Sequence, residues 1–511
     1  MSAIAGFIPV TAKAANVCLY CRVRKQKCDR TLPQCERCAV KGKVCDYTPY
    51  KEPPRLGDVD PEPSIISFEG CTHVDLSSRS TTALLHAVTV VADSKDASGS
   101  KAMLADTVYD ILDQANVDIS LVLEDFGPSI QQWCPIVPED FLKDRQNHAS
   151  YEQPPHEETY RPFLLLCLWL MSRRPCDNAE HITRCQLYRA LKQSLAIFQS
   201  GTNVNISILQ ASMLLALYET SHGMSNQAFQ TMSASVGILQ LLQHSATKSA
   251  NLVWTLEWIK PSLLMLDRVL TLTSPTHLPL ALPSYHTTTQ CISYNLAPEI
   301  PPHPPLGLAS ATSARKLHIR STVALATSPA LEYISSLVLN PPPQPNHAYD
   351  TATSSLTTCI QALVSKPEPH TWLHCDAIAL AFCTNILLQE AQMRHLSSTL
   401  PVLAGRPHPE YEKVHLALKY ARHMAWDMVK VGIQKINGEG ESGEEGVGEV
   451  GRLPFAGLCC VVRAGVAVLK TREFYADGDC VEEKEVEGFK RVVELFAGRW
   501  GVGQLYLRTS K

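Results

Sequence analysis

The feature of this sequence most suited to chemistry is a group of six cysteines within 28 residues near the N-terminus. The segment reads CLYCRVRKQKCDRTLPQCERCAVKGKVC, so the spacing Cys-x2-Cys-x6-Cys occurs twice. A Cys-x2-Cys pair can place two thiolates on one metal ion from a tight turn, and a third can return from the end of a short helix. The spacing therefore predicts a metal centre. Its candidate ligands are Cys18, Cys21, Cys28, Cys35, Cys38 and Cys45.

The number of ligands indicates the kind of centre. Two tetrahedral zinc ions need eight ligand positions, whereas the segment offers six thiolates and the first histidine is His73. Two sulfurs would then be shared, which gives a binuclear cluster. One zinc ion would leave two cysteines unused, and a RING or LIM module would need eight separate ligands. A chance cysteine-rich patch or a disulfide knot is disfavoured by the regular repeat and by the expected compartment.

That compartment follows from the N-terminus and the hydropathy. The first residues have no cationic region, and Pro9 interrupts their short apolar stretch, so we expect no signal peptide. The longest strongly apolar run, residues 163–171, is far shorter than the roughly 20 residues that span a bilayer. We therefore expect an intracellular, reducing compartment and no membrane partner.

Charge distinguishes this segment from the rest of the chain. Residues 13–45 hold nine Lys and Arg against two Asp and Glu, although the whole chain has a net charge of −4. Such asymmetry is typical of proteins that bind nucleic acid. Two Zn²⁺ and six thiolates would carry a net negative charge, so the attraction to phosphate must come from the cations.

Four of these cations lie between the second and third cysteines, at Arg22, Arg24, Lys25 and Lys27. We expect them on a short helix, with Arg22 and Lys25 on one face and Arg24 and Lys27 on another. A helix of this kind in the major groove can donate to guanine O6 and N7. A merely solvated charged helix is the alternative.

With these residues in place, the segment resembles the fungal zinc binuclear cluster DNA-binding domain, the six-cysteine type of the yeast galactose regulator. The match extends to Asp29, to Pro33 before the fourth cysteine and to Tyr47 after the sixth. The resemblance implies two zinc ions per chain, bridged by Cys18 and Cys35. The implied ligand sets are Cys18, Cys21, Cys28 and Cys35 for one ion, and Cys35, Cys38, Cys45 and Cys18 for the other.

The resemblance also implies roles for the cations. Lys25, three residues before the third cysteine, would contact bases, with Arg24 beside it. Arg22 and Lys27 would hold phosphates, and Arg30 would join this DNA-binding set. Lys41 and Lys43, in the second half, would belong to a scaffold. The DNA target would contain CGG-type half-sites.

The remaining chain divides by composition. We expect a disordered N-terminus over residues 1–17 and a proline-rich linker over 46–80, which has no heptad pattern for a dimerising coiled coil. Apolar residues then recur at helical spacing, so we expect a mostly all-α regulatory domain over 81–436 and a C-terminal helical segment over 452–511. The breaks within them are proline-rich loops near 297–312 and 340–347, and an acidic Gly-rich loop at 437–451. An acidic activation segment is the alternative for the last of these.

Three segments of the body resemble the regulatory domain that follows such zinc clusters in fungal transcription factors. They are the Trp-Cys-Pro segment at 133–137, the LLxLYE helix at 209–219, and Leu266-Asp267-Arg268. The resemblance would cover most residues from about 100 to 430. Ordinary helix packing explains most other apolar stripes.

No catalytic residue is predicted. The chain has no G-x-x-x-x-G-K-[ST], G-x-S-x-G or H-E-x-x-H motif, and no G-x-G-x-x-G after a strand. The cysteines of the body mostly lie in apolar helical stretches, where they are expected to be small core residues.

The sequence therefore predicts a nuclear, sequence-specific DNA-binding regulator of genes transcribed by RNA polymerase II, and no enzyme. Its expected partners are double-stranded DNA, a second copy bound through the helical body, and the transcription machinery or co-regulators. Control of a secondary-metabolite gene cluster is a common role of similar regulators. A zinc-dependent protein-interaction module or co-regulator without base readout is the main alternative, and an enzyme with an appended zinc domain is another.

Overall fold

The computed structural model divides the chain into two units, Met1–Ser67 and Phe68–Lys511. The structure describes residues 13–14, 16–32, 34–43, 45, 76–93, 97–138, 141–142, 160–173, 185–201, 205–246, 250–275, 277–282, 311–339, 345–364, 375–399, 408–436, 454–475 and 481–509. Within these ranges the regular structure is helical, apart from an isolated antiparallel bridge between Lys13 and Thr31. The expected fold class, a small cysteine-centred module followed by a helical body, is confirmed.

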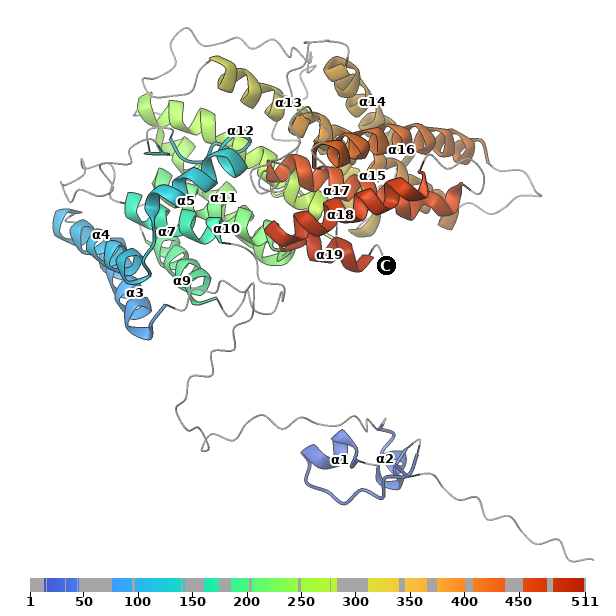
Figure 1. Ribbon diagram of the computed structural model, residues 1–511, viewed down its shortest axis with the longest axis horizontal. Helices are drawn as coiled ribbons and strands as arrows, with labels where there is room; N and C mark the ends of the chain where they lie inside the picture. Colours follow the sequence, from blue (N-terminus) through green and yellow to red (C-terminus); the bar gives the residue numbers. More distant parts are fainter. Residues whose placement is uncertain are drawn as a thin grey trace, which may run out of the picture. The chain divides into compact units, whose positions relative to one another are not determined.

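The first unit is built around its cysteines. It contains two five-residue helices, α1 (Leu19–Val23) and α2 (Glu36–Val40) (Figure 1). Helices this short are not stable in water by themselves. The apolar cluster between them consists of Cys18, Cys21, Cys35 and Cys38, all fully buried. The arrangement of the thiols therefore determines whether this unit can fold.

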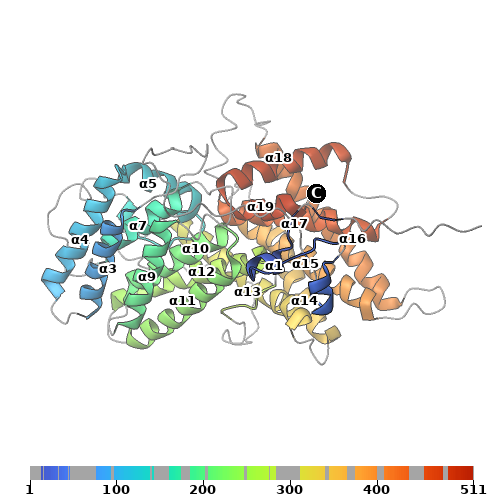
Figure 2. The same cartoon turned by 90° about the horizontal axis from the view of Figure 1, so that it is seen from below.

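The second unit is a bundle of helices that runs from α3 and α4 at one end, through α10 and α12, to α14 and α16 at the other (Figures 1 and 2). Its α-helices are α3 (Ser78–Asp93), α4 (Ala97–Gln114), α5 (Ile119–Phe126), α7 (Arg161–Ser172), α9 (Gln186–Ser200), α10 (Ile206–Ser221), α11 (Ser225–Ala246), α12 (Ala250–Thr273), α13 (Ala311–Leu339), α14 (Pro345–Val364), α15 (Cys375–Thr399), α16 (Pro409–Ile436), α17 (Phe455–Lys470), α18 (Glu483–Arg499) and α19 (Val502–Thr509).

Two helices form the centres of this bundle. All residues of α10 from 208 to 221 are buried, and the helix packs against α7, α9 and α11. In the other half α15 packs against α13, α16 and α17. Helix α10 is therefore enclosed by its neighbours, and from residue 208 to 221 it presents no polar face to solvent. The C-terminal helices therefore belong to the same packed body as the rest.

The Leu266-Asp267-Arg268 segment lies at a junction inside the bundle. Asp267 and Arg268 are fully buried and form an ion pair. The Asp267 carboxylate accepts the backbone N–H groups of Ala281 and Leu282 at 3.0 and 3.1 Å, and Arg268 donates to Ser328 Oγ at 3.0 Å. This pair ties α12 to the segment that follows it and to α13.

The other two segments singled out in the body are also polar junctions. Gln210 of α10 donates its amide to the carbonyl of Ile136 at 2.8 Å. Buried Glu219 accepts the Tyr188 hydroxyl at 2.7 Å and the Lys192 ammonium at 2.5 Å. These contacts give the segments a role in helix packing, and their relation to a fungal regulatory domain stays a prediction.

Several predicted boundaries shift. Residues 13 and 14 are not disordered, because Lys13 bridges Thr31 and the Ala14 N–H donates to the Arg30 carbonyl at 2.8 Å. Helix α3 begins inside the predicted linker because the Ser77 hydroxyl accepts the Ser80 N–H at 3.0 Å and caps it.

The predicted proline-rich loops are also shorter than expected. Helix α13 begins at residue 311, and α14 begins at Pro345, a first-turn position where the missing N–H is tolerated. The remaining predicted loop and linker residues, 1–12, 46–75, 297–310, 340–344 and 437–451 among them, lie outside the described ranges.

Within the described part of the chain, one helix segment, Lys316–Leu339, is long and apolar enough to cross a membrane by length and composition. In its most apolar window 61% of the residues are buried inside the fold, as in a core helix. Most of the body cysteines that the structure describes are buried as well. Burial raises the pKa of the Cys359 thiol to about 12, so that this cysteine is protonated and packs as an apolar side chain.

Candidate metal centre

The twofold cysteine repeat produces two equivalent pieces of backbone. Cys18 and Cys35 directly precede α1 and α2 in extended conformations, with φ and ψ of −62° and 148° for the first and −69° and 148° for the second. The carbonyl of Cys18 accepts the N–H of Arg22 at 3.0 Å, and that of Cys35 accepts the N–H of Ala39 at 2.9 Å. Each helix therefore starts at a candidate ligand.

The end of α1 turns the chain back toward the cluster. The N–H of Lys25 donates to the carbonyl of Arg22 at 2.9 Å, and the N–H of Gln26 donates to that of Cys21 at 2.8 Å. This pair of bonds is the Schellman pattern of helix ends, which needs a residue in the left-handed region. Lys25 occupies it, with φ of 51°.

Helix α2 ends in the same way. The N–H of Gly42 donates to the carbonyl of Ala39 at 3.1 Å, and the N–H of Lys43 donates to that of Cys38 at 2.9 Å. Here glycine takes the left-handed position, with φ of 59°. The two turns thus have the same geometry, but the left-handed position is occupied by a lysine in the first and by a glycine in the second.

These turns correct one expectation. Helix α1 ends at Val23, so Arg24, Lys25 and Lys27 do not lie on a helix and do not share faces with i,i+3 spacing. The physical reason is the left-handed backbone of Lys25, which closes the helix after five residues. The cations instead follow one another along a turn and an irregular segment.

The sulfur atoms form one compact cluster. Tetrahedral zinc–thiolate bonds of about 2.3 Å place two sulfurs on the same ion about 3.8 Å apart. The Sγ–Sγ distances are close to this value: 4.0 Å for Cys18–Cys35, 3.7 Å for Cys18–Cys38, 3.9 Å for Cys21–Cys35, 3.8 Å for Cys18–Cys28 and 3.6 Å for Cys35–Cys45. A disulfide needs about 2.05 Å, and all six cysteines are free. The donor set therefore fits metal ligation.

Two groups of four sulfurs can each hold one ion. Within each group the sulfurs lie within 4.8 Å of one another, and Cys18 and Cys35 belong to both groups. The first group adds Cys21 and Cys28, and the second is completed by Cys38 and Cys45. These are the same memberships as the ligand sets implied by the resemblance. Sharing two sulfurs lets six cysteines fill eight positions.

Burial of the thiols disfavours their charged form. It raises the pKa of Cys18 to about 11, and it raises the pKa of Cys21 and Cys35 as well. At Cys28 burial also acts upward, but hydrogen bonds from the backbone of Cys18 and Arg30 outweigh it and lower the pKa. A divalent cation would reverse the effect of burial, since ligation deprotonates thiols.

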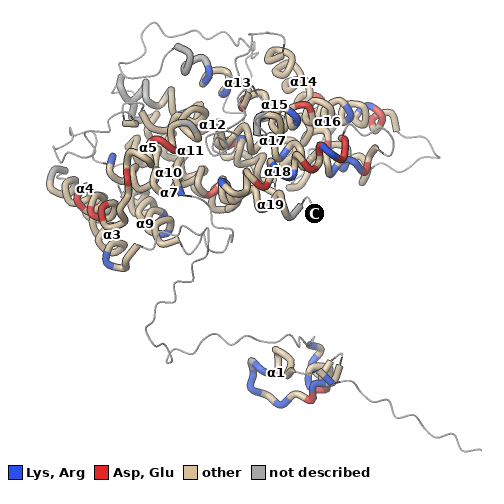
Figure 3. The backbone as a smooth tube through the Cα atoms, viewed as in Figure 1, with Lys and Arg blue, Asp and Glu red and all other residues tan. Residues whose placement is uncertain are grey.

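The candidate DNA-binding cations lie outside the sulfur cluster. Arg24, Lys25, Lys27 and Arg30 are exposed, whereas Arg22 is half-buried and donates from Nη2 to the carbonyl of Val17 at 3.0 Å. Figure 3 shows lysine and arginine following one another along the loop after α1. The structure thus gathers all five in one region of the module.

Two supporting contacts were not anticipated from the sequence. The guanidinium of Arg24 lies over the ring of Tyr20, 4.7 Å from its centroid, and Arg37 donates to the Gln26 side chain at 2.5 Å. The i,i+4 spacing of Tyr20 and Arg24 is the signal that could have revealed the first. Both contacts restrict the segment that carries the cations.

Asp29 joins the two halves of the module. Its carboxylate accepts the N–H of Glu36 at the start of α2 at 3.1 Å, and that of Thr31 at 3.4 Å. The hydrogen bond from Glu36 is the main cause of a lowered Asp29 pKa. This contact explains why an acid occupies an otherwise basic segment.

Comparison with known proteins agrees with this geometry. Residues 16–53 match the family described as the fungal Zn(2)-Cys(6) binuclear cluster domain. A relative from Emericella nidulans, the aspercryptin biosynthesis cluster-specific transcription regulator atnN, is 46% identical over 41 residues. That stretch is 8% of this chain and 7% of the relative, so the chain spans a small fraction of the relative's length. No solved structure matches this chain. The segment is therefore a zinc binuclear cluster domain, whose cysteines serve two zinc ions.

Proposed function

We propose that this protein is a nuclear, sequence-specific DNA-binding regulator of genes transcribed by RNA polymerase II. One observation carries the proposal: six sulfurs form two ligand groups that share Cys18 and Cys35, within a segment that matches the zinc cluster family. Bound zinc would supply the folding free energy of a module whose own helices are too short to be stable.

The chain's own residues would then position the DNA contacts. The turn closed by Lys25 and Gln26 exposes Arg24, Lys25 and Lys27 next to one another. We assign base contacts in CGG-type half-sites to Lys25 and Arg24, because lysine and arginine can donate to guanine O6 and N7. Arg22 and Lys27 would hold phosphates, with Arg30 beside them.

The relative supports a more specific role. Its printed name describes a regulator specific to one biosynthesis cluster. We therefore propose that this chain controls a secondary-metabolite gene cluster. The body would receive or relay the regulatory signal, and no catalytic role is assigned to it.

The helical body would also bind the protein partners. The proline-rich linker has no heptad pattern, so we propose that a homodimer forms through the helical body. Co-regulators or the transcription machinery would bind the same body. Sedimentation of the full chain tests the dimer, and a monomer at all concentrations would contradict it.

The central experiment measures promoter occupancy of the tagged full chain across the genome, together with transcript levels after gene deletion. We expect occupancy at CGG-containing promoters and altered expression of a group of neighbouring biosynthetic genes. The test variant is Lys25→Ala, and the matched control is Lys413→Ala, which removes a surface lysine of α16 paired with Asp350.

Lys25→Ala should lose the occupied sites while Lys413→Ala keeps them. If Lys25→Ala retains the wild-type pattern, the protein is recruited through another protein. That outcome would favour the alternative of a zinc-dependent interaction module without base readout.

A further inference from the structure

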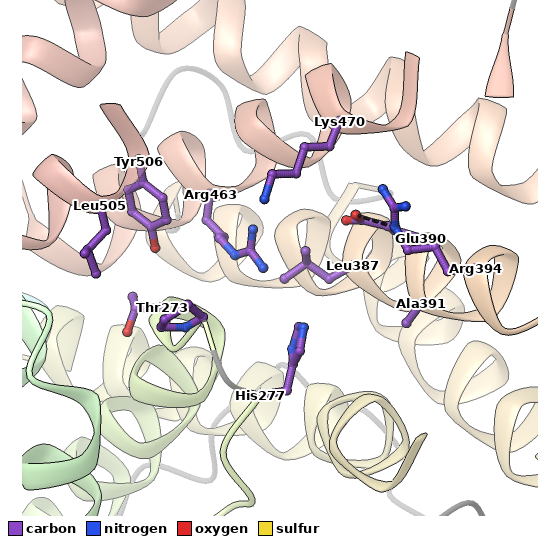
Figure 4. Close-up of a pocket in the computed structure, with 11 residues that line it drawn as sticks. Thr273, His277, Leu387, Glu390, Ala391, Arg394, Arg463, Lys470, Leu505 and Tyr506 are labelled. Carbon is purple, nitrogen blue, oxygen red and sulfur yellow. Dashed lines mark hydrogen bonds and ion pairs between the residues drawn. The ribbon is translucent and has the colours of Figure 1, made fainter. Parts of the chain in front are cut away.

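A cavity of about 210 Å³ opens at the surface of the helical body, between the end of α12, α15, α17 and α19 (Figure 4). Arg463 and Lys470 project into it from α17, and His277 points toward the same space from the opposite side. Glu390 and Arg394 of α15 line its third side. Helices far apart in sequence thus bring three permanent cations and one carboxylate together.

The charges in this cavity do not balance locally. Arg394 pairs with Glu390 at 3.2 Å and with Glu473 at 2.9 Å, so its charge is already compensated. Arg463 donates from Nε to the carbonyl of Leu272 at 3.2 Å, which is a neutral partner. Among the described residues, Lys470 forms no ion pair or hydrogen bond. Within the part of the chain that the structure describes, Arg463 and Lys470 therefore form no direct ion pair, although the Glu390 carboxylate attracts Lys470.

These cations also act on each other. Partial burial lowers the pKa of Lys470, repulsion from Arg463 and Arg394 lowers it further, and attraction to Glu390 opposes the shift. Burial likewise lowers the pKa of His277, with added repulsion from Arg463 and Lys470. Lys470 is exposed and Arg463 is half-buried, so both cations can be reached from solvent, and a bound anion would offset their mutual repulsion.

The lining of the cavity also includes apolar side chains. Leu387 is buried, Leu505 is half-buried and the ring of Tyr506 is buried beside them. At roughly 30 Å³ per water, the volume corresponds to about seven water molecules, which is the size of a small metabolite. Guanidinium and ammonium groups next to apolar side chains suit a ligand that combines carboxylates with a hydrocarbon body.

We propose that this cavity binds a small organic anion with two carboxylates and an apolar body, held by Arg463 and Lys470 and packed against Leu387 and Leu505. A ligand bound in this cavity would contact α12, α15, α17 and α19 at the same time. The proposal goes beyond DNA binding and does not depend on it, because binding is measured on the protein without DNA.

The test is calorimetric titration of the full chain, loaded with zinc, at constant ionic strength. Phthalate is the probe, since it combines two carboxylates with an aromatic ring. We expect saturable binding of phthalate, at least about tenfold weaker binding of inorganic phosphate, and no binding of the neutral dimethyl ester. Absence of saturable phthalate binding would overturn the proposal. Equal affinity for inorganic phosphate would contradict the claim that the site recognises an apolar body.

Three variants locate the site. Lys470→Gln should weaken phthalate binding about tenfold, as expected for loss of one charge-assisted contact, while Lys413→Gln on α16 should not change it. Glu390→Gln removes the carboxylate of the lining and should tighten binding several-fold, an effect that mere destabilisation does not produce. Unchanged affinity in both Lys470→Gln and Glu390→Gln would place phthalate elsewhere and overturn the assignment.

Discussion

The two halves of the zinc module have the same backbone but different side chains. An offset of 17 residues relates every cysteine of the first half to one of the second. Both helices start at a cysteine, both are five residues long, and both end in the same pair of hydrogen bonds. The repeated geometry is what the metal ligands require.

The differences lie in what the shared backbone presents. At equivalent repeat positions, Arg22 and Lys25 of the first half correspond to Ala39 and Gly42 of the second, and Lys27 corresponds to a valine. Lys25 keeps a left-handed backbone that costs an ordinary residue about 1–2 kcal/mol, whereas Gly42 has no such cost. Strain of this kind is typical of functional positions. The comparison teaches that the repeat builds the metal site and that its asymmetry carries the proposed DNA recognition.

The largest effect should come from breaking what the halves share. Cys18→Ser and Cys35→Ser should each release both zinc ions, because each sulfur belongs to both ligand groups. Cys21→Ser should first perturb one ion. Structural zinc contributes on the order of 10 kcal/mol to such modules, so the double loss should unfold the module.

Native mass spectrometry of the full chain counts the bound zinc ions in each variant. Cys459→Ser is the control, since this buried cysteine lies in α17 of the body. A Cys18→Ser protein that retains one tightly bound zinc ion would show that the thiolates are not shared.

The second effect concerns the asymmetry. Lys25→Ala should lose about 1–3 kcal/mol of preference for a CGG-type duplex over a scrambled one, since a base contact is removed. Lys27→Ala should weaken binding to both duplexes alike and lower the salt slope by about one unit. Lys43→Ala should matter less than either.

Titration of the full chain with both duplexes at several salt concentrations separates these cases. A wild-type specificity ratio in Lys25→Ala would move base recognition away from the first half. It would leave the strained backbone at this position without a functional reason.

Much of this organisation follows from the sequence alone, and the exceptions have physical causes. Spacing and ligand number predict the binuclear cluster, and apolar periodicity predicts the helical body. The early end of α1 was missed because a lysine gives no local signal for a left-handed turn, although Gly42 at the equivalent repeat position does. The cavity at Arg463 and Lys470 could not be foreseen, because its walls come from helices that meet only in the folded body.

The third effect tests the turn itself. Gly42→Ala should destabilise the second half by about 1–2 kcal/mol, because alanine is strained in the left-handed conformation of this residue. An added Cβ would meet no atom within 4 Å, so steric contact adds nothing to this cost. Lys25→Gly should relieve the corresponding strain in the first half while losing base preference. The rate of zinc release to a competing chelator measures the change in stability of the module in both variants of the full chain.

Lys41→Ala is the control for this pair, since Lys41 has φ of −96° and an alanine fits there without strain. Faster zinc release from Lys25→Gly than from the wild type would contradict the idea that lysine strains this turn.

The smallest effect concerns the stacking of Arg24 on Tyr20, a contact that the second half lacks because Arg37 occupies the position equivalent to Tyr20. Tyr20→Leu should weaken binding to the CGG-type duplex by about 0.5–1 kcal/mol, or roughly two- to fivefold, since the ring no longer holds the guanidinium in place. A double-mutant cycle with Arg24→Ala isolates the contact from other effects of each change. If the ring acts through Arg24, Tyr20→Leu should have no further effect on DNA affinity in the Arg24→Ala background. Additive losses in affinity would instead assign Tyr20 to the packing of the module, and the cations after α1 would then be positioned by the turn at Lys25 alone.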